Sequence, residues 1–252
     1  MSNEIYISKL RKQDLNTQRP ANRVYLVDLY SRIVDQFDSN SLLLEIGSGA
    51  GTSRHFMQNL NVIRTDILPW DEGEVVGAID ATKLPYPDDY FDGAFAIDVL
   101  HHLEYPIQVL SELRRVIKPS GRIVLIEPHV SLVSYLIFKI FHDEMTSLRI
   151  KFDPDQPAVG AAPSEGNQTL AQTIFRTKRG LRALREAGLL ERENLEMDFF
   201  HHFSFFATGG LTRTLPTPPI LIRCLLKIER LFPDFLSCYL SARGRYVLTV
   251  IK

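Results

Sequence analysis

The chain contains the stretch Leu42-Leu43-Leu44-Glu45-Ile46-Gly47-Ser48-Gly49-Ala50-Gly51-Thr52. Apolar, strand-forming residues run into an acid, and glycines then alternate with small residues. Glycine adopts positive φ and lets a ligand approach the backbone closely. The stretch therefore predicts a buried parallel strand, a tight turn and the start of a helix, with Thr52 or Ser53 available as N-cap. Such a unit forms a pocket for a nucleotide-type ligand.

Length and composition restrict the class of protein. The chain has 252 residues, of which 45% are hydrophobic and 23% charged, and its net charge is −1. These values predict one α/β domain over residues 1–252 with a full core, and they argue against a nucleic-acid partner. Two cysteines and the lack of a basic, then apolar N-terminal leader favour a cytoplasmic location. No uncharged apolar run approaches the roughly 20 residues of a membrane-spanning helix.

The details of the glycine turn indicate which ligand it holds. A dinucleotide fingerprint, G-x-G-x-x-G, needs a third glycine where this chain has Thr52. Instead, the chain has an acid two residues before the first glycine and an extra glycine at position 51. This pattern, Glu45-x-Gly47-x-Gly49-x-Gly51, resembles the signature of class I S-adenosylmethionine (SAM)-dependent methyltransferases. SAM carries a cationic amino group and a sulfonium but no pyrophosphate, which suits a loop beside carboxylates.

Two further acids follow the glycine turn. Residues 61–66 predict a second strand that ends at Asp66, which can accept hydrogen bonds from both ribose hydroxyls; a turn or N-cap role is the alternative, and we favour the ligand role. Residues 80–92 are similar to the D-A-x-x-L-P-F-P-D-x-x-F-D segment of the group that includes ubiquinone and menaquinone C-methyltransferases. In that group the first acid and the small residue after it meet the adenine, which implies this role for Asp80 and Ala81.

The same resemblance continues to His129. Residues 93–98 predict a fourth strand, and residues 98–103 are similar to the D-V-L-H-H-L segment of that group, whose fourth strand ends against the methionyl part of SAM. The resemblance implies SAM as cofactor and S-adenosylhomocysteine as product. The cofactor-binding residues that we assign are Glu45, Gly47, Ser48, Gly49, Gly51, Asp66, Ile67, Asp80, Ala81 and Asp98.

The resemblance also implies the fold. We expect a three-layer, doubly wound α/β structure, the Rossmann-like methyltransferase fold, with a seven-stranded, mostly parallel sheet whose last strand is antiparallel. Strands five, six and seven are expected at residues 122–128, 196–203 and 245–251. A helix capped by Thr177 and ended by Gly188 should precede strand six.

Residues 1–40 should form a helical cap, with a helix from Pro20 and a loop or mobile arm over Lys9–Arg19. The segment between the second and third acids is too short for a full crossover helix and a strand, so only a short strand is expected over residues 74–80. Trp70 in this segment either stacks on the adenine or fills the gap that the missing helix leaves.

Two apolar segments, residues 130–175 and 205–240, are expected as insertions after strands five and six, on the substrate side. Either they pack on each other, which we favour, or they form a greasy cavity or contact a membrane surface. We expect a small-molecule acceptor, apolar or lipid-linked, and peripheral membrane contact is retained as an expectation to be tested.

Methyl transfer requires the acceptor atom to lie in line with the methyl carbon, and an unactivated hydroxyl or acidic carbon also needs a general base. Histidine suits that role near neutral pH. We assign His101 as the catalytic residue and His129 as the reserve candidate, with a structural role as the alternative for each. No cysteine–histidine spacing resembles a metal site, so we expect no metal.

The sequence thus predicts a SAM-dependent methyltransferase, and two alternatives stay open. One is a methyltransferase-like binding subunit without catalysis, against which the retention of all three acids argues. The other is a nicotinamide dehydrogenase, which Thr52 at the third glycine position disfavours.

Overall fold

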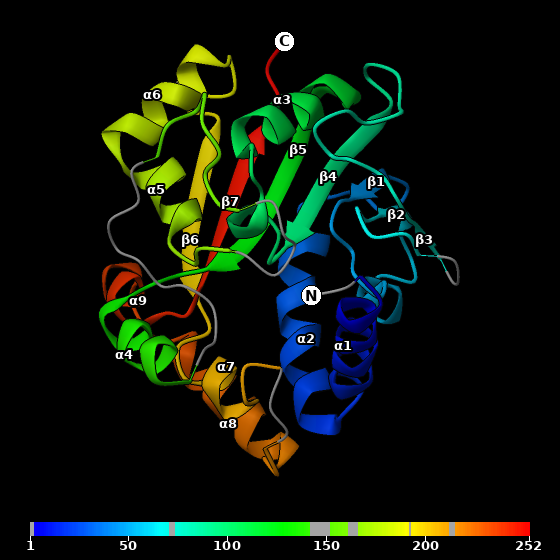
Figure 1. Ribbon diagram of the computed structural model, residues 1–252. Helices are drawn as coiled ribbons and strands as arrows, with labels where there is room; N and C mark the ends of the chain where they lie inside the picture. Colours follow the sequence, from blue (N-terminus) through cyan, green and yellow to red (C-terminus); the bar gives the residue numbers. More distant parts are fainter. Residues whose placement is uncertain (1–2, 71–73, 142–151, 161–165, 192, 212–214) are drawn as a thin grey trace.

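A seven-stranded sheet forms the centre of the molecule (Figure 1). The computed structural model describes residues 3–70, 74–141, 152–160, 166–191, 193–211 and 215–252, and its strand order is β3-β2-β1-β4-β5-β7-β6. The strands β3, β2, β1, β4 and β5 run parallel to one another, and β7 is antiparallel to both β5 and β6. The expected doubly wound fold is confirmed. The strands are β1 (Leu42–Glu45), β2 (Asn61–Thr65), β3 (Val75–Val76), β4 (Phe91–Ile97), β5 (Ile117–Pro128), β6 (Leu195–Phe200) and β7 (Arg243–Thr249).

Helices cover both faces of the sheet (Figure 1). The α-helices are α1 (Asn3–Thr17), α2 (Pro20–Val34), α3 (Pro106–Val116), α4 (Leu132–Phe141), α5 (Leu170–Arg176), α6 (Lys178–Glu186), α7 (Ser204–Ala207), α8 (Pro219–Glu229) and α9 (Asp234–Leu240), and two 3-10 helices are η1 (Thr52–His55) and η2 (Leu100–His102). The N-cap predicted for α6 is confirmed, since the Thr177 side chain accepts a hydrogen bond from the Gly180 amide.

Alternate residues of the central strands pack into two hydrophobic cores, one on each face of the sheet. Leu44 faces the core formed with α3, α5 and α6, whereas its neighbour Leu43 faces the core formed with α2, α7 and α8. The same alternation separates Leu125 from Val124 in β5. Because successive strand residues point to opposite faces, a sheet buried on both sides needs apolar residues at consecutive positions. This explains the continuous apolar run at the start of β1.

The N-terminal segment differs from the sequence prediction. Residues 9–19 were expected as a loop or mobile arm, but α1 spans Asn3–Thr17. The Asp14 carboxylate of α1 accepts hydrogen bonds from Thr52 Oγ1 and Arg54 Nη2, each at 2.7 Å. Tertiary contacts to the start of η1 therefore hold a helix whose sequence lacks an apolar stripe.

Several element boundaries were also predicted incorrectly. Strand β5 begins at Ile117, because Ile117 pairs with Phe91 of β4; a register shift follows, and pairing resumes at Arg122 with Gly93. Strand β6 ends at Phe200 and β7 begins at Arg243, so both lie a little earlier than predicted. The helix expected after the glycine turn is the short η1, whose N-cap residue is Gly51 without a side-chain cap. The short third strand was predicted correctly, although residues 71–73 lie outside the described residues.

Helices α4, α8 and α9, which belong to the two segments expected as insertions, lie at the end of the molecule where β5 terminates (Figure 1), whereas α5 lies beside α6. Helix α4 of the first insertion contacts α9 of the second, as expected if the insertions pack on each other. Helix α8 packs instead on α2. Within the described ranges, no helix combines the length and apolarity that a membrane span requires.

Candidate active site

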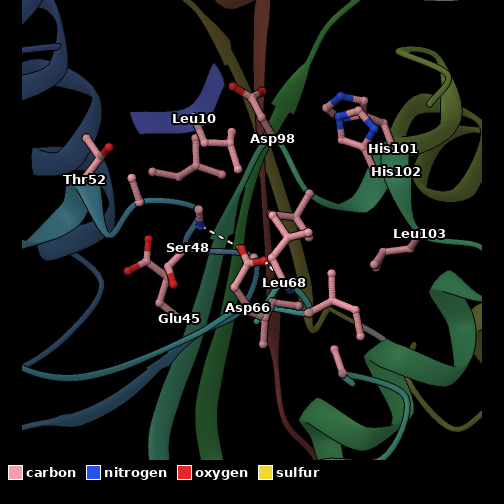
Figure 2. Close-up of a pocket in the computed structure, with 18 of the residues that line it drawn as sticks. Leu10, Glu45, Ser48, Thr52, Asp66, Leu68, Asp98, His101, His102 and Leu103 are labelled. Atoms are coloured by element: carbon pink, nitrogen blue, oxygen red, sulfur yellow. Dashed lines mark hydrogen bonds between the residues drawn. The ribbon is translucent and has the colours of Figure 1, made fainter. Parts of the chain in front are cut away.

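A cavity of about 680 Å³ lies along the ends of β1, β2 and β4 and reaches the start of β7. Figure 2 shows Glu45, Ser48 and Asp66 on one side of it and His101 and His102 on the other. This is the sheet edge at which doubly wound folds bind ligands. Nine of the ten residues assigned to the cofactor from the sequence line the cavity: Glu45, Gly47, Ser48, Gly49, Asp66, Ile67, Asp80, Ala81 and Asp98.

The glycine turn needs its glycines for two separate reasons. Gly47, Gly49 and Gly51 have φ of 61°, 55° and 73°, in the left-handed region that favours glycine. A Cβ atom on Gly47 would also lie 2.5 Å from Val99 Cγ2, so the Gly47 backbone is in close contact with the loop that follows β4. Gly51 does not line the cavity; its place is at the turn into η1.

Asp66 holds the glycine turn against the loop after β2. Its Oδ2 accepts a hydrogen bond from the Gly49 amide at 2.8 Å (Figure 2), and its Oδ1 accepts one from the Leu68 amide at 2.9 Å. Burial raises the pKa of this carboxyl, and the two amides oppose the increase. Carboxylate oxygens have further lone pairs, so Asp66 can still accept from ligand hydroxyls.

Glu45 lies at the end of β1 inside a buried polar network. Ser53 Oγ donates a hydrogen bond to Glu45 Oε2, and Arg64 Nε donates to Ser53 Oγ at 2.7 Å. Arg64 also lies 3.7 Å from Glu45 Oε2 and pairs with Glu74 at 3.1 Å. Burial raises the pKa of Glu45 from 4.5 to about 7, although Ser53 and Arg64 lower it. A cationic ligand in the cavity would favour the charged carboxylate.

Asp80 and Ala81 line the half of the cavity that contains the glycine turn, together with Ile67 and Ile79. The Asp80 side chain accepts hydrogen bonds from the amide and hydroxyl of Thr82, both at 2.8 Å. Trp70 is not one of the lining residues. Its ring lies 5.9 Å from the Arg11 guanidinium of α1, so the structure does not place it on a ligand face within the cavity.

Helix α1 contributes part of the cavity wall that the sequence did not reveal. Tyr6, Leu10, Gln13 and Asp14 line the cavity, with Leu10 and Asp14 next to the glycine turn and η1. A Cβ atom built on Gly49 would lie 3.9 Å from Leu10. These residues belong to no motif, and only the contacts of folded α1 bring them to the site.

The half of the cavity away from the glycine turn contains an ion pair between a buried arginine and a partly exposed aspartate. Arg243 at the start of β7 pairs with Asp98, which follows β4 and has a φ of 57°. The Arg243 guanidinium is buried, its Nε lies 3.4 Å from the Tyr25 hydroxyl, and it lies 4.5 Å from the Phe205 ring. Asp98 thus lines the cavity as expected, but its partner in the structure is an arginine 145 residues further along.

His101 and Glu127 form a buried polar pair. His101 Nδ1 lies 2.6 Å from Glu127 Oε2, and the same carboxylate accepts hydrogen bonds from the amides of Val99 and Leu100 at 3.0 and 2.7 Å. His101 lines the cavity. Glu127 was missed, although an acid at the end of a parallel strand is the same kind of signal that identified Asp66.

His129, the reserve candidate, does not line the cavity. Its Nε2 is 2.9 Å from the Cys238 carbonyl, and burial lowers its pKa to about 4. The geometry therefore supports His101 over His129 as the base candidate.

Comparison with protein families identifies the core of the chain. Residues 44–125 match the family model described as a methyltransferase domain. Curated relatives include the ubiquinone/menaquinone biosynthesis C-methyltransferases of Paraburkholderia phytofirmans and Burkholderia mallei, which are 39% and 41% identical over 59 residues. Each match covers 23% of this chain and about a quarter (24%) of the relative.

Comparison with solved structures supports the same fold. A SAM-dependent methyltransferase from Archaeoglobus fulgidus superimposes with a TM-score of 0.55, over 89% of this chain and 93% of that one, at 18% identity. A chain from the complex between the Haloferax volcanii Trm112 methyltransferase activator and a methyltransferase gives a TM-score of 0.52, over 99% and 96% of the two chains, at 14% identity. The resemblance to class I methyltransferases drawn from the sequence is confirmed.

Two glycine variants, one in the glycine turn and one after α6, separate the cost of positive φ from the cost of a steric clash. Gly188 also has positive φ, 67°, but a Cβ atom there meets nothing within 4 Å. Gly188→Ala should cost about 1 kcal/mol of unfolding free energy from backbone strain alone. Gly47→Ala should cost a further 1–3 kcal/mol, roughly the penalty of overpacking against Val99. Urea unfolding measures both, and equal losses would contradict the close contact.

Glu45 should make stability depend on pH in a defined direction. Its folded pKa of about 7 lies above the ordinary value of 4.5. Between these values the folded protein retains a proton that the unfolded chain releases, so stability falls as pH rises through the window. In Glu45→Gln the fall should be smaller by about 1–3 kcal/mol. Urea unfolding on both sides of the window tests this.

The control for this prediction is Glu74→Gln, which removes the other carboxylate beside Arg64 from an exposed position. This variant should keep the pH dependence of the wild type. A wild-type pH dependence in Glu45→Gln would show that Glu45 is ionised throughout the range.

Proposed function

We propose that this chain, whose fold and residues 44–125 are those of a class I methyltransferase domain, transfers the methyl group of SAM to a small apolar or lipid-linked acceptor. The observation that carries the proposal is the set of acids around the glycine turn. Glu45, Asp66 and Asp80 line one half of the cavity, and Asp14 of α1, which pairs with Arg54, also lines it. Carboxylates suit a cationic ligand and oppose a pyrophosphate.

The residues present fit SAM part by part. Asp66 would hold the ribose hydroxyls, Asp80 and the Ala81 amide would bind the adenine, and the glycine turn with Glu45 would hold the methionyl group. The close approach at Gly47 leaves backbone, not side chain, at the cavity surface. Bound there, SAM supplies an electrophilic methyl carbon.

The half of the cavity away from the glycine turn would receive the acceptor. Leu26, Phe205, Leu211 and Ala242 line it and belong to one apolar cluster. The Asp98–Arg243 pair adds a charged contact for a polar head group. The name of the curated relatives, ubiquinone/menaquinone biosynthesis C-methyltransferase, supports an apolar, ring-bearing acceptor.

His101 would remove a proton from the acceptor. The contact of its Nδ1 with Glu127 Oε2, at 2.6 Å, would orient the ring for this role. Glu127 does not touch the acceptor in this scheme; it positions His101 and the backbone of residues 99–101. This dyad supports catalysis over a purely binding role. The free cysteines Cys224 and Cys238 support a cytoplasmic location.

Cofactor binding tests the first half of the proposal. SAM and S-adenosylhomocysteine should each bind one per chain in isothermal titration, and Asp66→Asn should weaken binding by about tenfold or more, the value of a hydrogen bond to a charged group. The matched control is Asp92→Asn, since Asp92 also accepts a backbone hydrogen bond, from Leu42 at 2.7 Å, but does not line the cavity.

The control should bind like the wild type. Absence of binding by both SAM and S-adenosylhomocysteine would contradict the proposal, whereas NADH binding in a fluorescence titration would favour a dehydrogenase.

Methyl transfer tests the second half. With SAM labelled in its methyl group and a lipid extract as acceptor source, label should enter the organic phase. His101→Gln should lower this rate by about 10²- to 10⁴-fold, as loss of a general base does, with S-adenosylhomocysteine affinity unchanged. His129→Gln serves as the control and should retain activity. Equal losses in the two variants would remove His101 from the mechanism.

A further inference from the structure

Helix α8 has apolar residues on two faces, but only one of these faces packs against the rest of the protein. Its inner face places Ile222 and Leu226 in the core against α2. Its outer face carries Ile220, which is 63% exposed, and Ile228, which is 51% exposed. A helix at the surface of a domain needs a single apolar stripe to pack. The outer stripe therefore needs another explanation.

The outer stripe continues beyond the helix. Positions 220, 224, 228 and 231 follow one another at intervals of three or four residues and so lie on one side of the segment. Leu231 is 80% exposed, and Phe235 at the start of α9 is 72% exposed. Tyr239 in α9 and Leu136 in α4, which contacts α9, are also exposed. Contiguous apolar surface of this kind marks an interaction site.

Basic side chains flank the stripe. Arg223 and Lys227 are exposed and lie one position before Cys224 and Ile228; Arg230, at the same spacing, is also exposed but pairs with the Asp28 carboxylate of α2. Over residues 219–240 the exposed acid is Asp234, because Glu229 is buried. The segment thus presents a local excess of positive charge on a chain with a net charge of −1. Apolar and basic side chains together on one surface suit the interface of an anionic bilayer.

This surface is tied to the wall of the cavity. Glu229 at the end of α8 accepts hydrogen bonds from the Phe203 and Ser204 amides at 2.7 and 2.6 Å, and from the Ser204 hydroxyl at 2.7 Å. These residues begin α7, which supplies Phe205 to the cavity. Contact at the outer face would therefore lie next to the proposed acceptor half.

We propose that the outer surface of α8 and α9 docks on a membrane that contains anionic lipid. Leu231, Phe235 and Ile228 enter the boundary between headgroups and acyl chains, and Arg223 and Lys227 meet the lipid phosphates. Figure 1 shows α8 at the periphery of the molecule, away from the sheet, and α9 at the end of β6, which it contacts. The proposal goes beyond methyl transfer and does not require that activity.

A second copy of the chain fits this surface less well. A twofold contact through the same patch would bring Arg223 and Lys227 of one copy against those of the other, and like charges oppose such an interface. The most exposed apolar residues, Leu231 and Phe235, lie on either side of Pro233 in the connection between the two helices. Projecting apolar residues suit insertion into a bilayer.

The test is co-sedimentation of the full chain with vesicles. The wild type should bind vesicles of phosphatidylcholine with phosphatidylglycerol at least tenfold more strongly than vesicles of phosphatidylcholine alone, and binding should weaken with added salt. Two variants, Leu231→Glu with Phe235→Glu and Arg223→Glu with Lys227→Glu, should each lose at least tenfold in binding. Absence of wild-type binding to the anionic vesicles would overturn the proposal.

A matched control makes the same change of charge elsewhere. Arg182→Glu with Arg185→Glu alters two exposed basic residues of α6 and should bind vesicles within about threefold of the wild type, the effect of general electrostatics alone. An equal loss in this control would show non-specific charge attraction and overturn the surface assignment. So would a wild-type dimer that Leu231→Glu with Phe235→Glu converts to a monomer, because the patch would then be a self-interface.

Two further readouts keep the result interpretable. Titration with S-adenosylhomocysteine and thermal unfolding should be unchanged in all three variants, which separates failure of docking from misfolding and from failure of the proposed function. A polarity-sensitive fluorophore on the exposed Cys224, in a Cys238→Ser background, should shift to shorter wavelength when anionic vesicles are added. No shift in a protein that co-sediments would place the contact elsewhere and overturn the assignment.

Discussion

The hydrogen bonds of Asp66 determine the shape of the site. One carboxylate at the end of β2 accepts from the Gly49 amide of the glycine turn and from the Leu68 amide of its own loop. Its burial carries a free-energy cost that these two amides offset. Because the turn after β1 is fixed to the turn after β2, Gly47 and Gly49 keep their positive φ along the cavity. The cavity wall depends on this one constraint.

Charge divides the cavity into two halves with different chemistry. Acids surround the glycine turn, and burial keeps the pKa of Glu45 near 7 until a cation approaches. The other half is apolar, and its charges form the internal pair Asp98–Arg243. A cationic cofactor would thus bind in the acidic half of the cavity and an apolar acceptor in the apolar half. His101 lies across the cavity from Glu45 and Asp66 (Figure 2), and its Nδ1 is 2.6 Å from Glu127 Oε2.

The sequence predicts the fold and the cofactor half because both depend on local patterns. Glu45, Asp66 and Asp80 each follow or end a strand, so position along the chain suffices to place them at one sheet edge. Arg243 reaches Asp98 through the antiparallel pairing of β7 with β5, and α1 is held by contacts with η1 and α2. No local spacing encodes such partners. Glu127 is different, because its position near the end of the fifth predicted strand is a local pattern that could have identified it as a candidate site residue.

The most direct test of the account is a crystal structure with S-adenosylhomocysteine bound. The account predicts the ribose hydroxyls on Asp66, the adenine beside Asp80 and Ala81, the homocysteine part along the glycine turn, and the sulfur directed toward the half that contains Asp98, Arg243 and His101. A ligand in the reverse orientation, or bound outside this cavity, would contradict it.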